Sequence, residues 1–482
     1  MNLRRLVLGT LLASFRGPVA PRWAIDLVDE GLAGHVLFGF NVSDTDQLAA
    51  LAASLRAARA DVLIGIDEEG GDVTRLGHRD GSPYPGNGAL GAIGDPELTE
   101  RIYAAIGRDL AAVGINLDLA PSVDVNTASD NPIIGTRSFG ADSARVAAHS
   151  AAAIIGLQAA GVAACAKHFP GHGATDVDSH LHLPTIDASL DVVRGRDLPP
   201  FEAAIGAGTK SIMTAHIRLP EITGEMPATF SRAALLDLLR GELGFTGAIV
   251  TDAIEMLGAA RIAGGTARGA ALALAAGADL ICIGADVDQG LVEAVVADVV
   301  AAVQDGHLPL ERLEDAAARS AELAAWAAPS TTVTRAFTGT NLGLAAARRA
   351  ITIEGHVPPL AGALVVQLES ASTIAEGPVP WGVYPHVAAG VAPIRASAAT
   401  ANIDELRATA GGRPIVIAGR NLHRLAGAAT LIESLAAHQP VVVVEMGWPT
   451  TWRPAGVAAF LTTYGASRAN GRAAAEALGL AA

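Results

Sequence analysis

Residues 161–180 read GVAACAKHFPGHGATDVDSH, an apolar run followed directly by a loop dense in polar side chains. The run from Gly161 to Ala166 is typical of a buried strand. The next fourteen residues hold one lysine, three histidines and two acids, interrupted by glycines and a proline. Catalytic groups concentrate in loops that a rigid scaffold holds in place. We therefore interpret residues 167–180 as an active-site loop at the end of a strand.

Apolar, β-rich runs of this kind recur along the chain, separated by amphipathic or alanine-rich segments such as 44–59 and 143–158. The runs cover residues 6–15, 35–40, 62–67, 115–119, 162–168, 211–215, 248–251 and 280–283. Strands that alternate with helices form a parallel sheet, and eight of them suffice to close a barrel. The sequence predicts a (β/α)8 TIM barrel, an α/β fold.

The carboxyl ends of these runs carry conspicuous polar residues. Asp67 ends the third run, and Lys167 and His168 end the fifth. His216 follows the sixth run, and Asp252 follows the seventh. Because barrel active sites are built at the carboxyl ends of the strands, we expect these five side chains to meet at one mouth.

A second, smaller α/β domain is predicted after the barrel. Residues 329–343 are rich in Ser, Thr and Gly and lack apolar periodicity, which is typical of a linker. Strand candidates follow at 363–368, 414–418 and 440–445, and a helix is predicted at 467–478. The predicted organisation is a barrel domain over 1–328, a linker over 329–345 and a C-terminal α/β domain over 346–482.

The composition excludes several classes of protein. Hydrophobic residues make up 50% of the chain and charged residues 17%, so a large core is expected and global disorder is not. The formal net charge of −15, with no long basic run, argues against a nucleic-acid partner. Cys165 and Cys282 both lie in apolar runs, which predicts buried thiols rather than a disulfide or a thiolate metal site.

Neither a membrane segment nor a secretion signal is predicted. The longest apolar segment, 151–166, is shorter than the roughly 18 residues that a membrane helix needs. The start of the chain imitates a secretory signal, but Gly9 and Thr10 interrupt its apolar run and Arg16 ends it. We interpret that run as the first barrel strand and expect a cytoplasmic protein without membrane contact.

The 167–180 loop has three competing interpretations. The first is a purely structural loop, and the second is a metal site. A lone histidine is most often a hydrogen-bonded structural residue, which would suit His172 or His182 taken singly. In a metal site the Lys167 ammonium would lie beside the cation, and the glycines would fix the ligands poorly. Those ligands would be His168, His172, Asp178, His180 and His182.

Acid/base chemistry, the third interpretation, suits the loop better. Asp178 lies two residues from His180, close enough for a carboxylate to orient an imidazole and tune its charge. Such a histidine donates and recovers a proton near neutral pH. The missing partner is a nucleophile, and Asp252 is a candidate because it emerges from a buried strand. The alternative for Asp252 is a helix N-cap.

These motifs resemble those of the bacterial β-N-acetylglucosaminidases of glycoside hydrolase family 3. The resemblance spans the predicted barrel, and the 167–180 loop is its most specific part. The supporting motifs are IDEEGG at 66–71, NPIIGTRSFG at 131–140, MTAH at 213–216 and TDA at 251–253. The second domain, with TTYGASRAN at 462–470, resembles the C-terminal domain of longer family members, an α/β sandwich.

By this resemblance Asp252 is the nucleophile, His180 the general acid/base and Asp178 its partner. Sugar binding is expected from a set of charged and polar side chains, namely Asp67, Arg75, Arg137, Lys167, His168 and His216. The chain departs from the usual pattern of the family at four positions, Phe40, Glu68, Asp72 and Ala174. None of these residues is a proposed reacting group.

The resemblance implies two displacements through a glycosyl ester at Asp252, with retention at the anomeric carbon and no metal or organic cofactor. The expected enzyme is an exo-acting β-N-acetylhexosaminidase. It would remove terminal N-acetylglucosamine from small β-linked glycans, such as muropeptides released in peptidoglycan recycling. Three alternatives stay open: a phosphorylase that uses phosphate in place of water, a metal-dependent barrel hydrolase, and an inactive sugar-binding sensor. The sequence predicts no oligomeric state.

Overall fold

The computed structural model describes residues 2–175, 183–285, 287–327, 339–388 and 393–481. By contacts, the chain forms two compact units. The first unit comprises Met1–Glu69, Thr99–Ile134 and Gly140–Thr338, and the second comprises Gly70–Leu98, Gly135–Phe139 and Gly339–Ala482. Most of the predicted linker at 329–345 lies outside the described residues.

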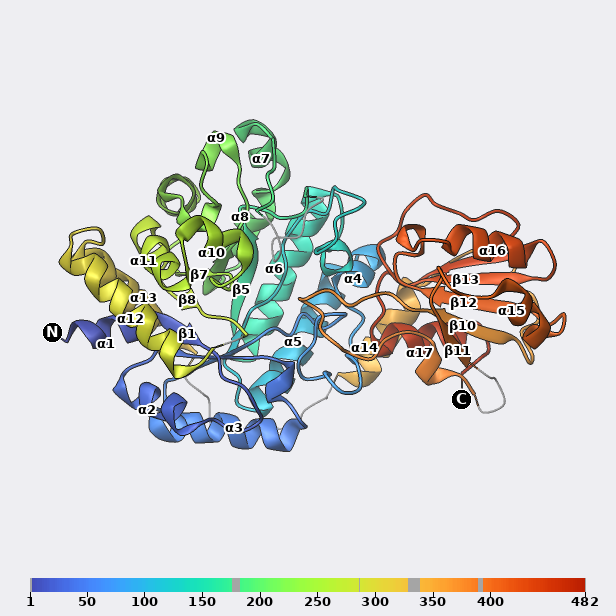
Figure 1. Cartoon of the computed structure of the whole chain (residues 1–482), viewed down its shortest axis with the longest axis horizontal. Helices are drawn as coiled ribbons and strands as arrows, with labels where there is room; N and C mark the ends of the chain where they lie inside the picture. Colours follow the sequence, from blue (N-terminus) through green and yellow to red (C-terminus); the bar gives the residue numbers. More distant parts are fainter. Residues whose placement is uncertain (1, 176–182, 286, 328–338, 389–392, 482) are drawn as a thin grey trace. The chain divides into compact units, whose positions relative to one another are not determined.

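Eight parallel strands form the sheet of the first unit (Figure 1). They are β1 (Leu11–Ala13), β2 (Gly34–Leu37), β3 (Leu63–Ile66), β4 (Leu117–Asp118), β5 (Ala163–Phe169), β6 (Ser211–Thr214), β7 (Ala248–Thr251) and β8 (Ile281–Cys282). The sheet order is β7-β6-β5-β4-β3-β2-β1-β8, and a parallel bridge between Val250 and Leu280 joins β7 to β8. The strands therefore close into a barrel, which confirms the predicted fold class.

Helices precede, connect and follow the barrel strands. They are α1 (Leu3–Leu8), α2 (Arg22–Glu30), α3 (Thr45–Ala58), α5 (Pro96–Ala112), α6 (Ser143–Ala159), α7 (Leu190–Arg196), α8 (Pro199–Gly206), α9 (Pro220–Thr223), α10 (Leu257–Ala263), α11 (Thr266–Ala276), α12 (Gln289–Gln304) and α13 (Leu310–Trp326), with a π-helix at Ala233–Glu242. Side chains from all eight strands meet in one buried cluster that contains Cys165 and Cys282 as free thiols. Among the described residues no helix is both long and apolar enough to cross a membrane.

The beginning of the chain differs from the prediction of a strand over 6–15. Residues Leu3–Leu8 form helix α1, and β1 covers Leu11–Ala13. The Asn2 side chain accepts a hydrogen bond from the Arg4 N–H at 3.1 Å and so caps this helix. Strand β1 follows only after Gly9, because the capped turn uses the first half of the apolar run.

A six-stranded sheet organises the second unit, with the order β11-β10-β12-β13-β14-β9. Its strands are β9 (Thr352–Gly355), β10 (Leu364–Leu368), β11 (Pro393–Ala396), β12 (Ile415–Gly419), β13 (Val441–Glu445) and β14 (Ala459–Thr462), all parallel except β9. Alternate residues of β13 point to opposite faces: Val442 and Val444 pack with α17 (Arg468–Ala477), whereas Val441 and Val443 pack with α15 (Ile403–Ala410) and α16 (Ala428–Ala436). Helices thus cover both faces, as expected of an α/β sandwich.

The second unit also includes two segments, 70–98 and 135–139, that interrupt the predicted barrel domain of 1–328. The Asp72 carboxylate accepts hydrogen bonds from Thr136 Oγ1 at 2.7 Å and from the Ala466 N–H at 2.8 Å. Helix α4 (Asn87–Ile93) packs against α14 (Thr340–Ala350). At Gly343 a side chain would overlap the carbonyl oxygen of Pro83. These contacts explain why the unit is discontinuous in sequence.

Candidate active site

Lys167, near the carboxyl end of β5, forms a charged centre at the mouth of the barrel. Its Nζ lies 2.8 Å from Asp67 Oδ1 and 2.9 Å from Glu69 Oε1. The Lys167 and Glu69 side chains are 2% and 3% exposed, whereas Asp67 is 18% exposed. A charge is tolerated away from water only when it is paired, so the lysine fixes both acids. Asp67 is the partner with surface left for a ligand.

Asp118, the last residue of β4, is a further acid near Lys167. Burial raises its pKa well above the ordinary value, although its Oδ1 accepts a hydrogen bond from the Glu68 N–H at 2.9 Å. The raised pKa favours the neutral acid. A third negative charge beside Lys167 is thereby avoided.

His168 is held by Asp124, which follows β4. Its Nδ1 lies 2.7 Å from Asp124 Oδ2, and its backbone N–H donates to Asp124 Oδ1 at 3.2 Å. Burial by itself would raise the pKa of Asp124, but the neighbouring His168 and His172 hold it below the ordinary value. The ionised carboxylate therefore sets the orientation of the His168 ring, as in other carboxylate–histidine pairs.

The His172 imidazole is buried, although the region around it is polar. The side chain is 2% exposed, and neither ring nitrogen has a hydrogen-bond partner among the described residues. Its ring centroid lies 5.9 Å from that of His168 in an edge-to-face arrangement. Burial, followed by the neighbouring His168, lowers its pKa to about 4. The ring is therefore neutral at physiological pH.

This low pKa predicts that the first unit loses stability in mild acid. Between pH 6.5 and 4 the unfolded chain binds a proton at His172 that the folded chain does not, so the free energy of unfolding falls as the pH falls. The difference amounts to about 3 kcal/mol at most. Urea unfolding at several pH values should show a flatter dependence for His172→Phe. The exposed His307→Phe control should keep the wild-type dependence, and parallel curves for wild type and His172→Phe would refute the assignment.

Glycines in the described part of the loop allow close packing against neighbouring segments. Gly171 has φ +123°, and a Cβ there would lie 2.7 Å from the Asp197 Cβ. A Cβ at Gly173 would overlap the Val125 carbonyl oxygen. Asn131, the first residue of the NPIIGTRSFG motif, donates its side-chain N–H to the His172 carbonyl at 3.0 Å. Residues 168–175 are thus fixed against neighbouring segments of the first unit.

Asp252 follows β7, at the same end of the barrel as Lys167. Its Oδ1 accepts a hydrogen bond from the Ala253 N–H at 2.8 Å. Three residues later, Glu255 accepts hydrogen bonds from the Gly284 and Ala285 N–H groups at 2.9 and 3.1 Å. Burial raises the pKa of Glu255. Glu255 therefore anchors the segment after β8, while Asp252 is the acid available for chemistry.

His216, after β6, is fully buried behind the Asp252 segment. Its Nδ1 lies 2.8 Å from Thr229 Oγ1, and its Nε2 lies 3.0 Å from the Ala253 carbonyl oxygen. Both ring nitrogens are thus engaged by the protein. This geometry favours a role in positioning the Asp252–Ala253 peptide, whereas the sequence analysis assigned His216 to substrate binding.

Four predicted site residues remain. Arg75 and Arg137 belong to the second unit. The Arg75 guanidinium donates to the carbonyl oxygens of Ala375 and Glu376 at 2.8 and 3.3 Å, and the Arg137 carbonyl accepts from Asn87 Nδ2 at 2.7 Å. The predicted acid/base pair, Asp178 and His180, lies outside the described residues. Of the nine predicted site residues, five therefore gather at the barrel mouth.

A metal centre was one of the alternatives for this loop. Within the part of the chain that the structure describes, no group of three His, Cys, Asp or Glu side chains is arranged to hold a metal ion. Asp178, His180 and His182 lie outside that part.

Family comparison gives these residues a context. Residues 18–323 match the family described as the glycosyl hydrolase family 3 N terminal domain. The chain belongs to this family. The match covers the barrel unit from before β2 to α13 and includes the segments that carry Asp67, Lys167 and Asp252. It confirms the family resemblance predicted from the sequence motifs.

Two curated relatives and two solved structures extend the comparison. The chain is 40% identical to a β-hexosaminidase of Stenotrophomonas maltophilia over 264 residues, 53% of this chain and 77% of the relative. It is 39% identical to β-hexosaminidase A of Pseudoalteromonas piscicida over 249 residues, 47% of this chain but only 42% of that longer protein. A family 3 β-N-acetylglucosaminidase from Paenibacillus sp. str. FPU-7 superposes with a TM-score of 0.90 at 31% identity, covering 100% of this chain and 97% of the other. A β-N-acetylhexosaminidase from Beutenbergia cavernae covers 67% of this chain and 99% of its own, with a TM-score of 0.61 at 30% identity.

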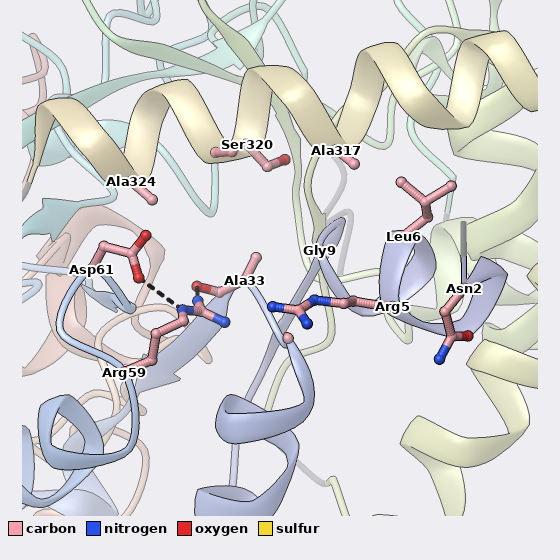
Figure 2. Close-up of a pocket in the computed structure, with 12 residues that line it drawn as sticks. Asn2, Arg5, Leu6, Gly9, Ala33, Arg59, Asp61, Ala317, Ser320 and Ala324 are labelled. Atoms are coloured by element: carbon pink, nitrogen blue, oxygen red, sulfur yellow. Dashed lines mark hydrogen bonds and ion pairs between the residues drawn. The ribbon is translucent and has the colours of Figure 1, made fainter.

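A cavity of about 350 Å³ lies at the opposite end of the barrel strands (Figure 2). Its wall includes Gly9, Ala33 and Asp61, which precede β1, β2 and β3. None of the seven predicted site residues that the structure describes lines it. Because barrel enzymes place their chemistry at the carboxyl ends of the strands, this cavity is not the active site of a family 3 enzyme.

Proposed function

We propose that this family 3 protein is a retaining exo-β-N-acetylhexosaminidase that hydrolyses terminal N-acetylglucosamine from small β-linked glycans. One observation carries the proposal: the Lys167–Asp67–Glu69 ion group and Asp252 share the carboxyl end of one closed barrel. Paired, fixed charges of this kind suit neighbouring sugar hydroxyls, and a carboxylate at the same mouth suits attack on an anomeric carbon.

The proposed mechanism has two steps. An Asp252 oxygen attacks the anomeric carbon while the glycosidic C–O bond breaks, and the leaving oxygen takes a proton from His180. A water molecule then gives a proton to His180 and attacks the same carbon, which breaks the ester and regenerates the Asp252 carboxylate. Asp178 would orient His180. Lys167, Asp67 and His168 would hold the sugar, with Arg75 and Arg137 as further predicted members of the binding set, and His216 would position the Asp252–Ala253 peptide.

The names of the relatives favour hydrolysis over phosphorolysis, since both curated relatives are called β-hexosaminidases. A muropeptide substrate and a cytoplasmic setting remain part of the proposal. The test is incubation with 4-nitrophenyl N-acetyl-β-glucosaminide in phosphate buffer, followed by NMR of the first product formed. We expect free N-acetylglucosamine as the β-anomer. The α-anomer, or a glucosaminide 1-phosphate, would overturn the proposal. Parallel assays on muropeptides and chitobiose, with cell fractionation, test the substrate and the compartment.

Replacing Asp124 by asparagine is expected to lower kcat/KM on this substrate about 30- to 100-fold. The reason is the loss of a charge-assisted hydrogen bond to His168, which contributes about 2–3 kcal/mol. Ser122→Ala is a matched control, because Ser122 Oγ donates to the same Asp124 oxygen at 3.1 Å. That variant should lose less than about fivefold. Equal losses in the two variants would show that His168 does not depend on the charge of Asp124.

A further inference from the structure

The sheet of the second unit has a point where its connections change direction. Strand β10 pairs with β11 on one side and with β12 on the other, all in parallel. The chain therefore leaves β10 toward one edge and leaves β12 toward the opposite edge (Figure 1). In open α/β sheets, ligands bind in the crevice that such a reversal leaves outside the carboxyl ends of the strands.

A cavity of about 350 Å³ lies next to this reversal, at the carboxyl ends of β10 and β11. Gln367 of β10, the following residues Glu369 and Ser370, Arg395 of β11 and Trp381 contribute to its wall. Its lining is thus mainly polar, with one large aromatic side chain. A cavity of this size and composition suits a small polar ligand with one apolar face.

Trp381 is held rigidly. The centre of the Arg420 guanidinium lies 4.4 Å from the Trp381 ring centroid, and Gln367 Nε2 donates to the Trp381 carbonyl oxygen at 3.4 Å. Arg420 covers one face of the indole but does not line the larger cavity, so a different part of the ring borders it. Fixing an aromatic side chain in advance lowers the entropic cost of binding against it.

Arg420 is itself an unusual group, because it follows β12 at the reversal and is only 6% exposed. Its Nε donates to Ser370 Oγ at 3.3 Å, and its Nη1 donates to Glu376 Oε2 at 2.9 Å. Its Nη2 is buried without a partner among the described residues. A buried donor without a partner is costly, and this arginine is the group that covers one face of Trp381.

The charges at the cavity favour a neutral ligand. Arg395 Nη1 lies 3.7 Å from Glu369 Oε1, and the Arg395 guanidinium also lies 4.6 Å above the Tyr384 ring. The two charges at the rim cancel, and a second acid, Glu376, is paired with Arg420. A phosphate would meet these carboxylates, whereas sugar hydroxyls both accept from arginine and donate to carboxylates. The C–H face of a pyranose ring suits the indole.

We propose that this cavity, lined by Gln367, Glu369, Ser370, Trp381 and Arg395, binds one neutral sugar residue of a glycan. The site is an accessory subsite of the second unit, distinct in its residues from the barrel site. The choice of a chitooligosaccharide as the glycan rests on the proposed function, whereas the sugar-binding chemistry of the cavity does not.

Calorimetric titration of the full-length Asp252→Ala protein with chitotetraose tests the proposal. A saturating competitive inhibitor derived from N-acetylglucosamine blocks the barrel site. We expect that chitotetraose still binds when the inhibitor is present. Its Kd should rise at least about fivefold in Asp252→Ala/Trp381→Ala. The control Trp326→Ala, in α13, should retain this binding. Absence of this binding, or its persistence in the Trp381 variant, would overturn the proposal.

A second variant keeps the proposal testable if the Trp381→Ala substitution impairs folding. Glu369→Gln keeps the size of the side chain at an exposed position and should weaken the same binding about threefold. In the otherwise wild-type enzyme, Trp381→Ala should lower the ratio of kcat/KM for chitotetraose to kcat/KM for the chromogenic monosaccharide. Equal losses on both substrates would count against the subsite. If wild type cleaves neither substrate, the proposed function fails, while the calorimetric result still decides the subsite.

Discussion

The Asp252→Ala variant is expected to lose on the order of 10⁴-fold or more in kcat on a chromogenic N-acetylglucosaminide. Without the carboxylate, no covalent ester forms, and water must displace the leaving group in one step with no protein nucleophile. Initial rates of wild type and variant, together with thermal unfolding curves, measure the effect. The unfolding temperature should change little, because the Asp252 Oδ1 accepts a local hydrogen bond from the N–H of the adjacent residue Ala253, and this N–H can bond to water instead.

Chemical rescue makes this prediction specific. Azide fits the space left by the carboxylate and can attack the anomeric carbon, while the leaving oxygen still takes its proton from His180. The Asp252→Ala variant should therefore gain activity with added azide and release a glycosyl azide of inverted configuration. Wild type should form no inverted product.

Glu255 supplies the matched control on the same segment. Its oxygens already accept N–H groups from Gly284 and Ala285, and burial raises its pKa. Glu255→Gln should therefore retain kcat within about tenfold. If Glu255→Gln abolishes activity while Asp252→Ala keeps more than a tenth of it, Glu255 is the nucleophile and the proposed mechanism is wrong.

The sequence predicted the barrel well where burial is complete. Strand β7 has the predicted bounds, and β5 differs by one residue at each end, because uninterrupted apolar runs reflect strands covered on both faces. In the second unit, β10, β12 and β13 were found for the same reason. Strands β9, β11 and β14 were missed. β9 is exposed along its length, and β11 begins with Pro393 at the edge of the sheet, so neither carries an apolar pattern. β14 is buried, but it covers only the four residues Ala459–Thr462, which is a short run to recognise.

The candidate site could be predicted only in part from the sequence. Asp67, Lys167, His168 and Asp252 stood out because each lies at the carboxyl end of a recognisable strand. Four further residues set the charges of the site, namely Glu69, Asp118, Asp124 and His172. Their importance comes from contacts between segments that are distant in the sequence. Glu69 had a weak signal, as the second acid of the IDEEGG motif. Spacing along the chain could not show that Asp124 holds His168, which lies 44 residues away.

Lys167→Met is expected to destabilise the barrel by about 3–5 kcal/mol, the usual result of removing one partner from a buried ion group. Glu69 would be left 3% exposed without its cation, close to the like charge of Asp67. Calorimetric unfolding measures the effect. Lys210→Met is the control, because that half-buried lysine lies 5.0 Å from the Trp326 ring centroid and should cost about 1 kcal/mol or less.

A triple variant separates the structural role of Lys167 from its proposed role in sugar binding. In Lys167→Met/Asp67→Asn/Glu69→Gln, the two acids are neutralised together with the lysine, and no buried charge is left unpaired. Most of the lost stability should return, because replacing a whole buried ion group by neutral residues is often close to neutral. Activity should stay at least about 100-fold below wild type, since the charged contacts to the sugar hydroxyls are still absent. Recovery of activity along with stability would show that the ion group serves the fold alone and does not contact the substrate.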